Sequence, residues 1–140
     1  MSKIILVTGG SRGIGAATCI RAANAGYDVA VNYRKDEKAA ENLVSEIKVL
    51  GSRAIAVKAD VRKENDVIGM FENVTKQLGP ITALVNSAGV GGSNMLVANF
   101  EMKTLELLMQ INVIGVMLCC REAARRMSTN SGGKGGSIVN

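Results

Sequence analysis

The sequence predicts an α/β fold with a doubly wound parallel sheet. Short apolar segments of strand length alternate with longer segments of helical periodicity along all 140 residues. The first strand segment is apolar throughout, as expected for a parallel strand that is buried on both faces. Connections between such strands are right-handed crossovers. The chain is long enough for one hydrophobic core and has no internal boundary, so we predict a single domain over residues 1–140.

The strands are predicted from apolar runs that end in polar or glycine-rich segments. In chain order they cover residues 4–8, 28–33, 53–59, 82–86 and 137–140. The last of these begins after a connector of Gly, Ser and Lys, and the segment after the fourth strand, residues 87–100, is predicted to be an irregular loop with one helical turn. Five parallel strands of this kind need a helix between each consecutive pair.

The helices are predicted from apolar residues at helical spacing and from the glycines that follow them. They cover about residues 13–25, 39–50 and 67–78, and a long helix covers about residues 102–127. Gly26, Gly51 and Gly79 directly follow the first three, where a left-handed residue commonly ends a helix.

The composition excludes several classes of function. The sequence has no histidine, and two of its three cysteines are adjacent. Without histidine, catalysis by a Ser–His–Asp or Cys–His arrangement is excluded. The cysteines have no zinc-ligand spacing and are poorly placed for disulfides, so we expect buried thiols and no metal site. The net charge of +5 is spread along the chain and only 3% of residues are aromatic. A mildly basic surface is therefore a better interpretation than nucleic-acid binding.

No segment is predicted to enter a membrane. No apolar run approaches the roughly 20 residues that a spanning helix needs. The N-terminal run at residues 4–7 is too short for a secretory signal and leads straight into the first strand. We therefore expect a cytoplasmic protein.

The strongest signal for a site is the segment between the first strand and the first helix. Residues 8–15 read Thr-Gly-Gly-Ser-Arg-Gly-Ile-Gly, and ligands of open parallel sheets bind outside the carboxyl ends of the strands. We expect Gly9 to allow a tight turn, Gly13 to leave room for a pyrophosphate, and Gly15 to let the helix pack closely on the sheet. The free amides of the helix N-terminus would then receive the phosphates. The alternative is a glycine turn without a ligand.

Four motifs give the sequence a resemblance to the short-chain dehydrogenase/reductase family, whose fold is of the Rossmann type. Residues 8–15 resemble its cofactor signature, residues 86–89 (Asn-Ser-Ala-Gly) its Asn-Asn-Ala-Gly motif, Asp60-Val61 its adenine-contacting pair, and Asn112 its helix asparagine. Ser87 in place of the second Asn is a mild departure, and the similarity runs along the whole chain. The resemblance implies a nicotinamide cofactor and hydride transfer between this cofactor and a small-molecule carbonyl compound or secondary alcohol.

The resemblance also implies which residues bind the cofactor. They are Gly9, Ser11, Arg12, Gly13, Ile14 and Gly15 in the glycine turn, Asn32, Tyr33 and Arg34 at the end of the second strand, Asp60 and Val61 after the third, and Asn86, Ala88 and Gly89 at the end of the fourth. Two of them have ordinary alternatives, because Asp60 could instead cap the third helix and Gly89 could be a turn residue only.

The residues after the second strand favour NADP(H) over NAD(H). An NAD enzyme usually has a carboxylate there, about twenty residues beyond the glycine loop, which holds the ribose hydroxyls. This chain has Asn32-Tyr33-Arg34-Lys35 and no carboxylate before Asp36. The guanidinium groups of Arg34 and Arg12 could clamp a 2′-phosphate. The alternative is that Arg34 is a solvated surface residue.

The long helix carries two further expectations. Asn112 lies among apolar residues, where a buried amide needs partners. The resemblance implies a catalytic role for it, at a helix distortion where it holds a water that connects the catalytic Lys to solvent; the alternative is an amide satisfied by backbone alone. The helix is apolar on nearly every face between Leu105 and Cys120, more than one buried stripe requires. The resemblance implies a homo-oligomer interface on residues 102–127, and burial beneath C-terminal segments is the alternative.

The other catalytic residues that the resemblance implies are a Ser after the fifth strand and a later Tyr-x-x-x-Lys. The only tyrosines, Tyr27 and Tyr33, begin no such motif, and the sequence ends in the fifth strand. We therefore expect the N-terminal, cofactor-binding portion of a longer reductase, truncated after the start of that strand, which is inactive and prone to associate in isolation. The alternatives are a naturally short, non-catalytic dinucleotide-binding module and a methyltransferase-like domain that binds S-adenosylmethionine.

Overall fold

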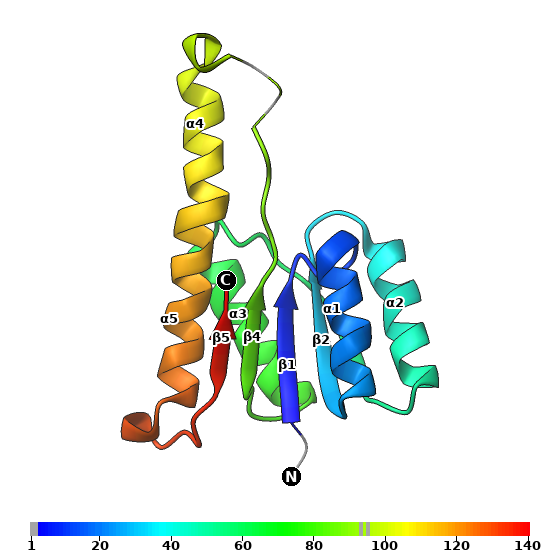
Figure 1. Cartoon of the computed structure of the whole chain (residues 1–140). Coiled ribbons are helices and arrows are strands. Elements are labelled where there is room, and N and C mark those ends of the chain that lie inside the picture. Colours follow the sequence, from blue (N-terminus) through cyan, green and yellow to red (C-terminus); the bar gives the residue numbers. More distant parts are fainter. Residues whose placement is uncertain (1–2, 93, 95) are drawn as a thin grey trace.

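The parallel sheet that the sequence predicts is present in the computed structural model, which describes residues 3–92, 94 and 96–140 (Figure 1). All strand pairs are parallel, in the order β3-β2-β1-β4-β5. The strands are β1 (Lys3–Thr8), β2 (Tyr27–Tyr33), β3 (Ala54–Lys58), β4 (Ala83–Asn86) and β5 (Ser137–Val139). The prediction of a doubly wound α/β fold is confirmed, and each strand lies within two residues of its predicted bounds.

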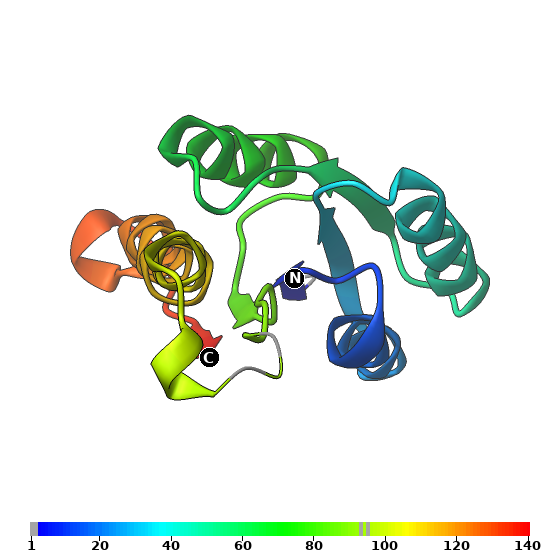
Figure 2. The same cartoon turned by 90° about the horizontal axis from the view of Figure 1, so that it is seen from above.

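Helices cover both faces of this sheet. They are α1 (Gly13–Asn24), α2 (Glu37–Val49), α3 (Glu64–Gln77), α4 (Met102–Met109), η2 (Gln110–Gly115) and α5 (Val116–Met127), with short 3₁₀ turns at η1 (Val97–Asn99) and η3 (Thr129–Ser131). Viewed from above, α3 lies on the opposite side of the sheet from α1 (Figure 2). Gly26 and Gly51 have φ values of +82° and +93° and end α1 and α2 as the sequence predicts.

Two hydrophobic clusters divide the core by the alternation of strand side chains. Ile5 and Val7 of β1 pack with α1 and α2, whereas Ile4 and Leu6 pack with α3 and α5. Successive residues of a strand point to opposite faces, so a fully apolar β1 is required by helices on both sides. Cys19 belongs to the first cluster and Cys119 to the second, and burial raises the pKa of each thiol to about 12. Cys120 is only half-buried, which differs from the expectation of three buried thiols.

The strand order reverses between β1 and β4. From β1 the chain first builds β2 and β3 on one side and then crosses to β4 and β5 on the other. The loops that leave β1 and β4 therefore diverge at their carboxyl ends, and this is the place where open α/β sheets bind ligands.

The predicted long helix is one continuous helical stretch with a π-helical segment, η2, in its middle. Its first part, α4, extends beyond the end of the sheet and has no buried residue, whereas α5 packs on α3 and β4 (Figure 1). By length and composition alone, Met102–Met127 could cross a membrane, with a mean hydropathy of 1.4 in its most apolar window. This corrects the expectation that no segment reaches such a length; 17% of that window is buried, and a single helix of this kind is weak evidence for a membrane span.

Candidate functional site

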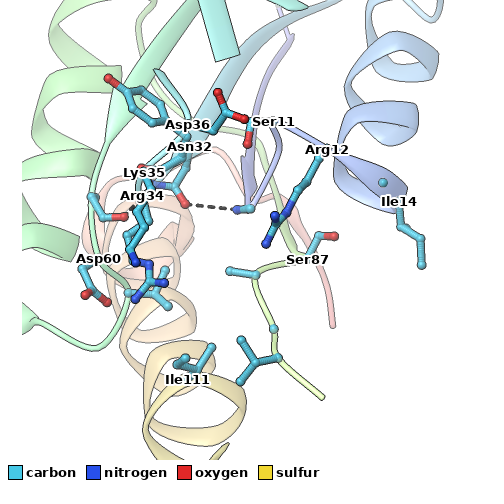
Figure 3. Close-up of a pocket in the computed structure, with 18 residues that line it drawn as sticks. Ser11, Arg12, Ile14, Asn32, Arg34, Lys35, Asp36, Asp60, Ser87 and Ile111 are labelled. Carbon is cyan, nitrogen blue, oxygen red and sulfur yellow. Dashed lines mark hydrogen bonds between the residues drawn. The ribbon is translucent and has the colours of Figure 1, made fainter. Parts of the chain in front are cut away.

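A cleft of about 390 Å³ opens at the carboxyl ends of the strands, beside the point where the strand order reverses (Figure 3). All the predicted binding residues line it except Gly15 and Asn86. Lining residues that the sequence analysis missed are Lys35, Asp36, Ala59, Ser87, Val90 and Ile111. Lys35 and Ser87 are sequence neighbours of predicted residues, whereas Ile111 reaches the cleft only because η2 passes close to it.

The glycine turn is fixed by two close backbone approaches. Gly9 has a φ of +59°, and a Cβ there would lie 2.7 Å from the Cα of Ala88 after β4. A Cβ on Gly15 would overlap the Gly9 carbonyl oxygen, so Gly15 packs against the turn itself and not against the sheet as predicted. Gly10, which the sequence analysis did not single out, is less tightly confined, because its Cβ would lie 3.0 Å from the Val7 carbonyl oxygen.

Gly13 differs from these glycines because open space lies beside it. Its φ is +56°, and a Cβ at this position would meet no atom within 4 Å. The residue lines the cleft at the first turn of α1. This is the room that the sequence analysis expects at Gly13.

Two buried polar side chains hold the turn in place. The Gly9 amide donates to Asn32 Oδ1 at 3.1 Å, and Asn32 Nδ2 donates to the carbonyls of Val57 and Ala59 at 3.2 Å each. Thr8 Oγ1 accepts hydrogen bonds at 3.1 Å from the amides of residues 87 and 88. Asn32 is predicted to contact the cofactor, yet its amide is used to join the turn to β3. Asn32 therefore holds the glycine turn in position.

The N-terminus of α1 has no side-chain cap among the described residues. Its N-cap residue is Arg12, and its first turn contains no acidic residue. The neighbouring α2 is capped by Asp36, whose Oδ1 accepts from the Ala39 amide at 3.0 Å. The first amides of a helix carry partial positive charge and need partners. The first residues of α1, Gly13 and Ile14, line the cleft, and the start of a helix is a suitable place for a phosphate group.

Cationic side chains surround the cleft. Arg12 extends from the glycine turn on one side, and Arg34 and Lys35 follow β2 on the other (Figure 3). Between them and α2, the Tyr33 hydroxyl donates to Glu37 Oε1 at 3.0 Å, and burial together with this hydrogen bond raises the pKa of Tyr33. The Tyr33 hydroxyl is therefore occupied by its hydrogen bond to Glu37, while the exposed Arg12 and Arg34 are available to an anion.

Asp60 lies at the end of β3 with its carboxylate held by Arg62. Arg62 Nε donates to Oδ1 at 2.9 Å, and the Arg62 amide donates to the same oxygen at 3.1 Å. The side-chain hydrogen bond from Arg62 is the main cause of the lowered pKa of Asp60. Helix α3 begins at Glu64 with Lys63 as its N-cap, so the alternative that Asp60 caps this helix is wrong. Its neighbour Val61 lines the cleft and packs in the core.

Asn86 faces away from the cleft. Its Nδ2 donates to Asn140 Oδ1 at 2.7 Å and lies 3.4 Å from Cys120 Sγ, on the side of β5 and α5. Its Oδ1 is buried and has no hydrogen-bond partner among the described residues. Of the Asn-Ser-Ala-Gly segment, residues 87–89 line the cleft.

Asn112 lies at a helix distortion, as the resemblance implies, because η2 is π-helical. The residue is exposed and not buried as expected. Its Oδ1 accepts from the Val90 amide at 3.0 Å and its Nδ2 donates to the Val90 carbonyl at 2.8 Å. The amide is therefore satisfied by backbone, and it fastens the segment after β4 to the long helix. Gly89 lies beside it, since a Cβ there would be 3.3 Å from Asn112 Oδ1.

Comparisons with known proteins agree with this geometry. A profile of the short chain dehydrogenase family matches residues 3–140. The chain is 44% identical over 137 residues to the uncharacterized oxidoreductase YgfF of Escherichia coli, covering 98% of this chain and 56% of YgfF. It is 36% identical over 140 residues to the 3-oxoacyl-[acyl-carrier-protein] reductase FabG of Staphylococcus epidermidis, covering all of this chain and 56% of FabG.

A solved structure is similar as well. The structure of a short chain dehydrogenase from Burkholderia cenocepacia in complex with NADP matches with a TM-score of 0.83 and 37% identity, over 89% of this chain and 50% of that one. The chain thus spans about half the length of the relatives it matches. The resemblance drawn from the four motifs is confirmed: the chain belongs to the short-chain dehydrogenase family.

Proposed function

We propose that this chain is the NADP(H)-binding portion of an oxidoreductase that transfers a hydride between a nicotinamide cofactor and a carbonyl compound or secondary alcohol. The observation that carries the proposal is the cleft at the uncapped start of α1, which is lined by Arg12 and Arg34 and by open space at Gly13. Helix amides and guanidinium groups both favour phosphate. The relative from Burkholderia cenocepacia is described in complex with NADP, which supports the same choice of cofactor.

Each part of the cleft has a role in this proposal. The amides at the start of α1 bind the pyrophosphate, and Arg12 and Arg34 bind a 2′-phosphate on the adenosine ribose. Asp60 and Val61 bound the adenine end, while Ile14 and residues 88–90 bound the other end. A nicotinamide dinucleotide, when bound, supplies or accepts the hydride.

Asn112 is proposed to support catalysis from outside the cleft. Its side chain is occupied by the Val90 backbone, so its contribution is to fix the loop after β4 and to keep η2 in its π-helical form. The proton donor and its lysine are absent from these 140 residues, since no Tyr-x-x-x-Lys occurs in them. We propose that the isolated chain binds the cofactor without reducing a carbonyl.

The second candidate is a non-catalytic dinucleotide-binding module. Both candidates bind the cofactor, and they differ in whether a protein of the relatives' length contains the remaining catalytic groups. Two properties remain predictions in either case, namely a cytoplasmic location and self-association through residues 102–127.

The cofactor choice is tested by measuring dissociation constants of the chain for NADPH and NADH. We expect NADPH to bind at least about tenfold more tightly, because a charge-assisted pair of guanidinium contacts to a phosphate is worth more than 1.4 kcal/mol. Arg34→Ala should lose most of this difference. Equal affinities, a preference for NADH, or binding of S-adenosylmethionine without nicotinamide dinucleotides would contradict the proposal.

A further inference from the structure

Arg62 has a specific contact with the site although it does not line the cleft. Besides the two bonds to Asp60 Oδ1, it binds the other carboxylate oxygen, with Nη2 2.5 Å from Oδ2. The side chain of Asp60 is 11% exposed and that of Arg62 27% exposed. The pair is thus largely withdrawn from water, and both oxygens of the carboxylate are occupied by one guanidinium group in a bidentate arrangement.

A second arginine, Arg34, lies near the same carboxylate. Arg34 and Asp60 both line the cleft, and Figure 3 shows the Arg34 guanidinium beside the Asp60 side chain. Within the described residues Arg34 makes no ion pair, so its charge is free, although it is close enough to contribute to the lowered pKa of Asp60. Asp60 therefore has two cationic neighbours and is paired with the one outside the cleft.

We propose that Arg62 is a positioning residue for cofactor selectivity: by occupying the Asp60 carboxylate, it leaves the Arg34 guanidinium free to bind a phosphate on the adenosine ribose. The inference rests on the proposed NADP(H) function. An unpaired carboxylate at this place would weaken the binding of a 2′-phosphate in two ways. It would attract Arg34 into an ion pair, and its negative charge would repel the phosphate directly.

The effect is expected to be selective for the phosphorylated cofactor. NADH has no 2′-phosphate, so its binding depends on neither the free Arg34 nor the charge of Asp60 at that position. A purely structural role for Arg62 would instead weaken NADPH and NADH equally. The ratio of NADPH to NADH affinity thus distinguishes a positioning role of Arg62 from a purely structural one.

The test is a double-mutant cycle on the 140-residue chain, with NADPH and NADH as the titrated ligands. In Arg62→Gln we expect the ratio of NADPH to NADH affinity to fall by about fivefold, the effect of one partly exposed ion pair. In Asp60→Asn no carboxylate competes for Arg34, so the ratio should not fall. Adding Arg62→Gln to Asp60→Asn should then leave the ratio of NADPH to NADH affinity unchanged.

A matched control exists at the opposite end of β3. Arg53 makes a similar pair with Asp28, with Nη2 2.7 Å from Oδ2, and Arg53→Gln should lower stability without changing the ratio. If Arg62→Gln does not fold by circular dichroism, Arg62→Lys takes its place. Lysine keeps the charge without the bidentate geometry, and we expect it to lower the ratio by about twofold.

The possible outcomes separate the two proposals. A wild-type chain without preference for NADPH overturns the proposed function and this inference with it. A selective wild type with an unchanged ratio in the Arg62 variant overturns the inference alone. A fall of the ratio that persists in the Asp60→Asn background also overturns it, because Arg62 would then act on the phosphate itself.

Discussion

Gly9 joins two loops of the site at a single backbone position. Its left-handed φ lets the chain turn sharply out of β1, and the missing side chain lets the segment after β4 approach to within contact of the turn. Asn32 and Thr8 hold these two loops by hydrogen bonds. A change at Gly9 should therefore disturb both walls of the cleft together.

We predict that Gly9→Ala lowers stability and abolishes tight cofactor binding. The left-handed backbone costs a non-glycine residue about 1–2 kcal/mol, and the 2.7 Å approach to the Cα of Ala88 would also displace the segment after β4. We expect a loss of about 3 kcal/mol in the free energy of unfolding and a rise of tenfold or more in the dissociation constant of NADPH. Urea unfolding and NADPH titration measure the two effects.

Gly26→Ala is the control for the backbone conformation alone. Its φ is +82° and a Cβ there meets no atom within 4 Å. It should cost about 1 kcal/mol and leave NADPH affinity unchanged. If Gly9→Ala has no larger effect than Gly26→Ala, the close approach to Ala88 is not what fixes the turn.

Some residues of the site could be predicted from the sequence, and others could not. The glycine turn and Arg34 each directly follow a strand with a clear pattern, so their place at the cleft could be predicted. Asn32 forms its bonds with the glycine turn and with β3, and Arg62 is paired with a residue two positions away. Such partners depend on tertiary packing and on rotamers, which have no one-dimensional pattern.

Among the elements, the long helix differs most from what its periodicity predicts. Apolar residues on nearly every face predict a long helix there, and the structure has one, but they do not reveal that Gln110–Gly115 is π-helical. The distortion coincides with two contacts to the site, the Asn112–Val90 pair and the approach of Gly115 to Val61. Insertions of this kind are often found at functional sites.

We predict that Gly115→Ala is destabilising, although alanine normally favours a helix. A Cβ on Gly115 would lie 2.8 Å from Val61 Cγ2, so the helix would have to move away from the end of β3. We expect a loss of about 1–2 kcal/mol in thermal or urea unfolding. Because Val61 lines the cleft, affinity for NADPH should fall as well.

Gly69→Ala in α3 is the matched control for helix propensity. Gly69 is an exposed helical glycine with open space at its Cβ, so the substitution should stabilise the protein by about 0.5–1 kcal/mol. A stabilising effect of the same size for Gly115→Ala would contradict the proposed contact between η2 and Val61.

Helix α5 contains a buried carboxylate, Glu122, that the sequence analysis did not single out and that pairs with arginines of the same helix. Glu122 is 3% exposed, and its oxygens accept from Arg125 at 2.9 Å and from Arg126 at 2.5 Å. Arg126 also lies over the Phe71 ring of α3, 5.3 Å from its centre. Burial alone would raise the pKa of Glu122, but the arginines outweigh it and the pKa is lowered.

We predict that Glu122→Gln costs about 2 kcal/mol at neutral pH, the value of hydrogen bonds to a charged group. Since the pKa of Glu122 is lower in the folded state, its contribution is present above its ordinary value of 4.5 and disappears as the pH falls through the folded-state value. The stability difference between wild type and variant should therefore shrink below about pH 4.5. Urea unfolding over a pH series measures this.

Glu72→Gln provides the control, because Glu72 is exposed on α3. It should change stability by less than about 0.5 kcal/mol at any pH. If the stability difference between wild type and Glu122→Gln stayed constant as the pH fell below about 4.5, the effect of the substitution would come from packing and not from charge.

The two edges of the sheet are unlike. The side of β2 and β3 is enclosed by α1 and α2, whereas β5 is an exposed strand and α4 stands free of the sheet (Figure 1). Large apolar side chains are exposed along this second side, among them Met102 at 68%, Met109 at 54% and Met117 at 65%. The predicted excess of apolar faces on the long helix is thus present as exposed surface.

We predict that the 140-residue chain self-associates through this surface. Contiguous apolar area of this kind favours contact with another molecule, and α4, η2 and α5 together present it along residues 102–117. Sedimentation equilibrium at increasing concentration should show species larger than a monomer. The double variant Met109→Lys/Met117→Lys should shift the distribution toward monomer, because it places two charges in the middle of the apolar strip. Val49→Lys, at an apolar residue 87% exposed at the end of α2, should leave the distribution unchanged. If all three proteins remain monomeric at every concentration, or if Val49→Lys acts as strongly as the double variant, the long helix is not the surface through which the chain associates.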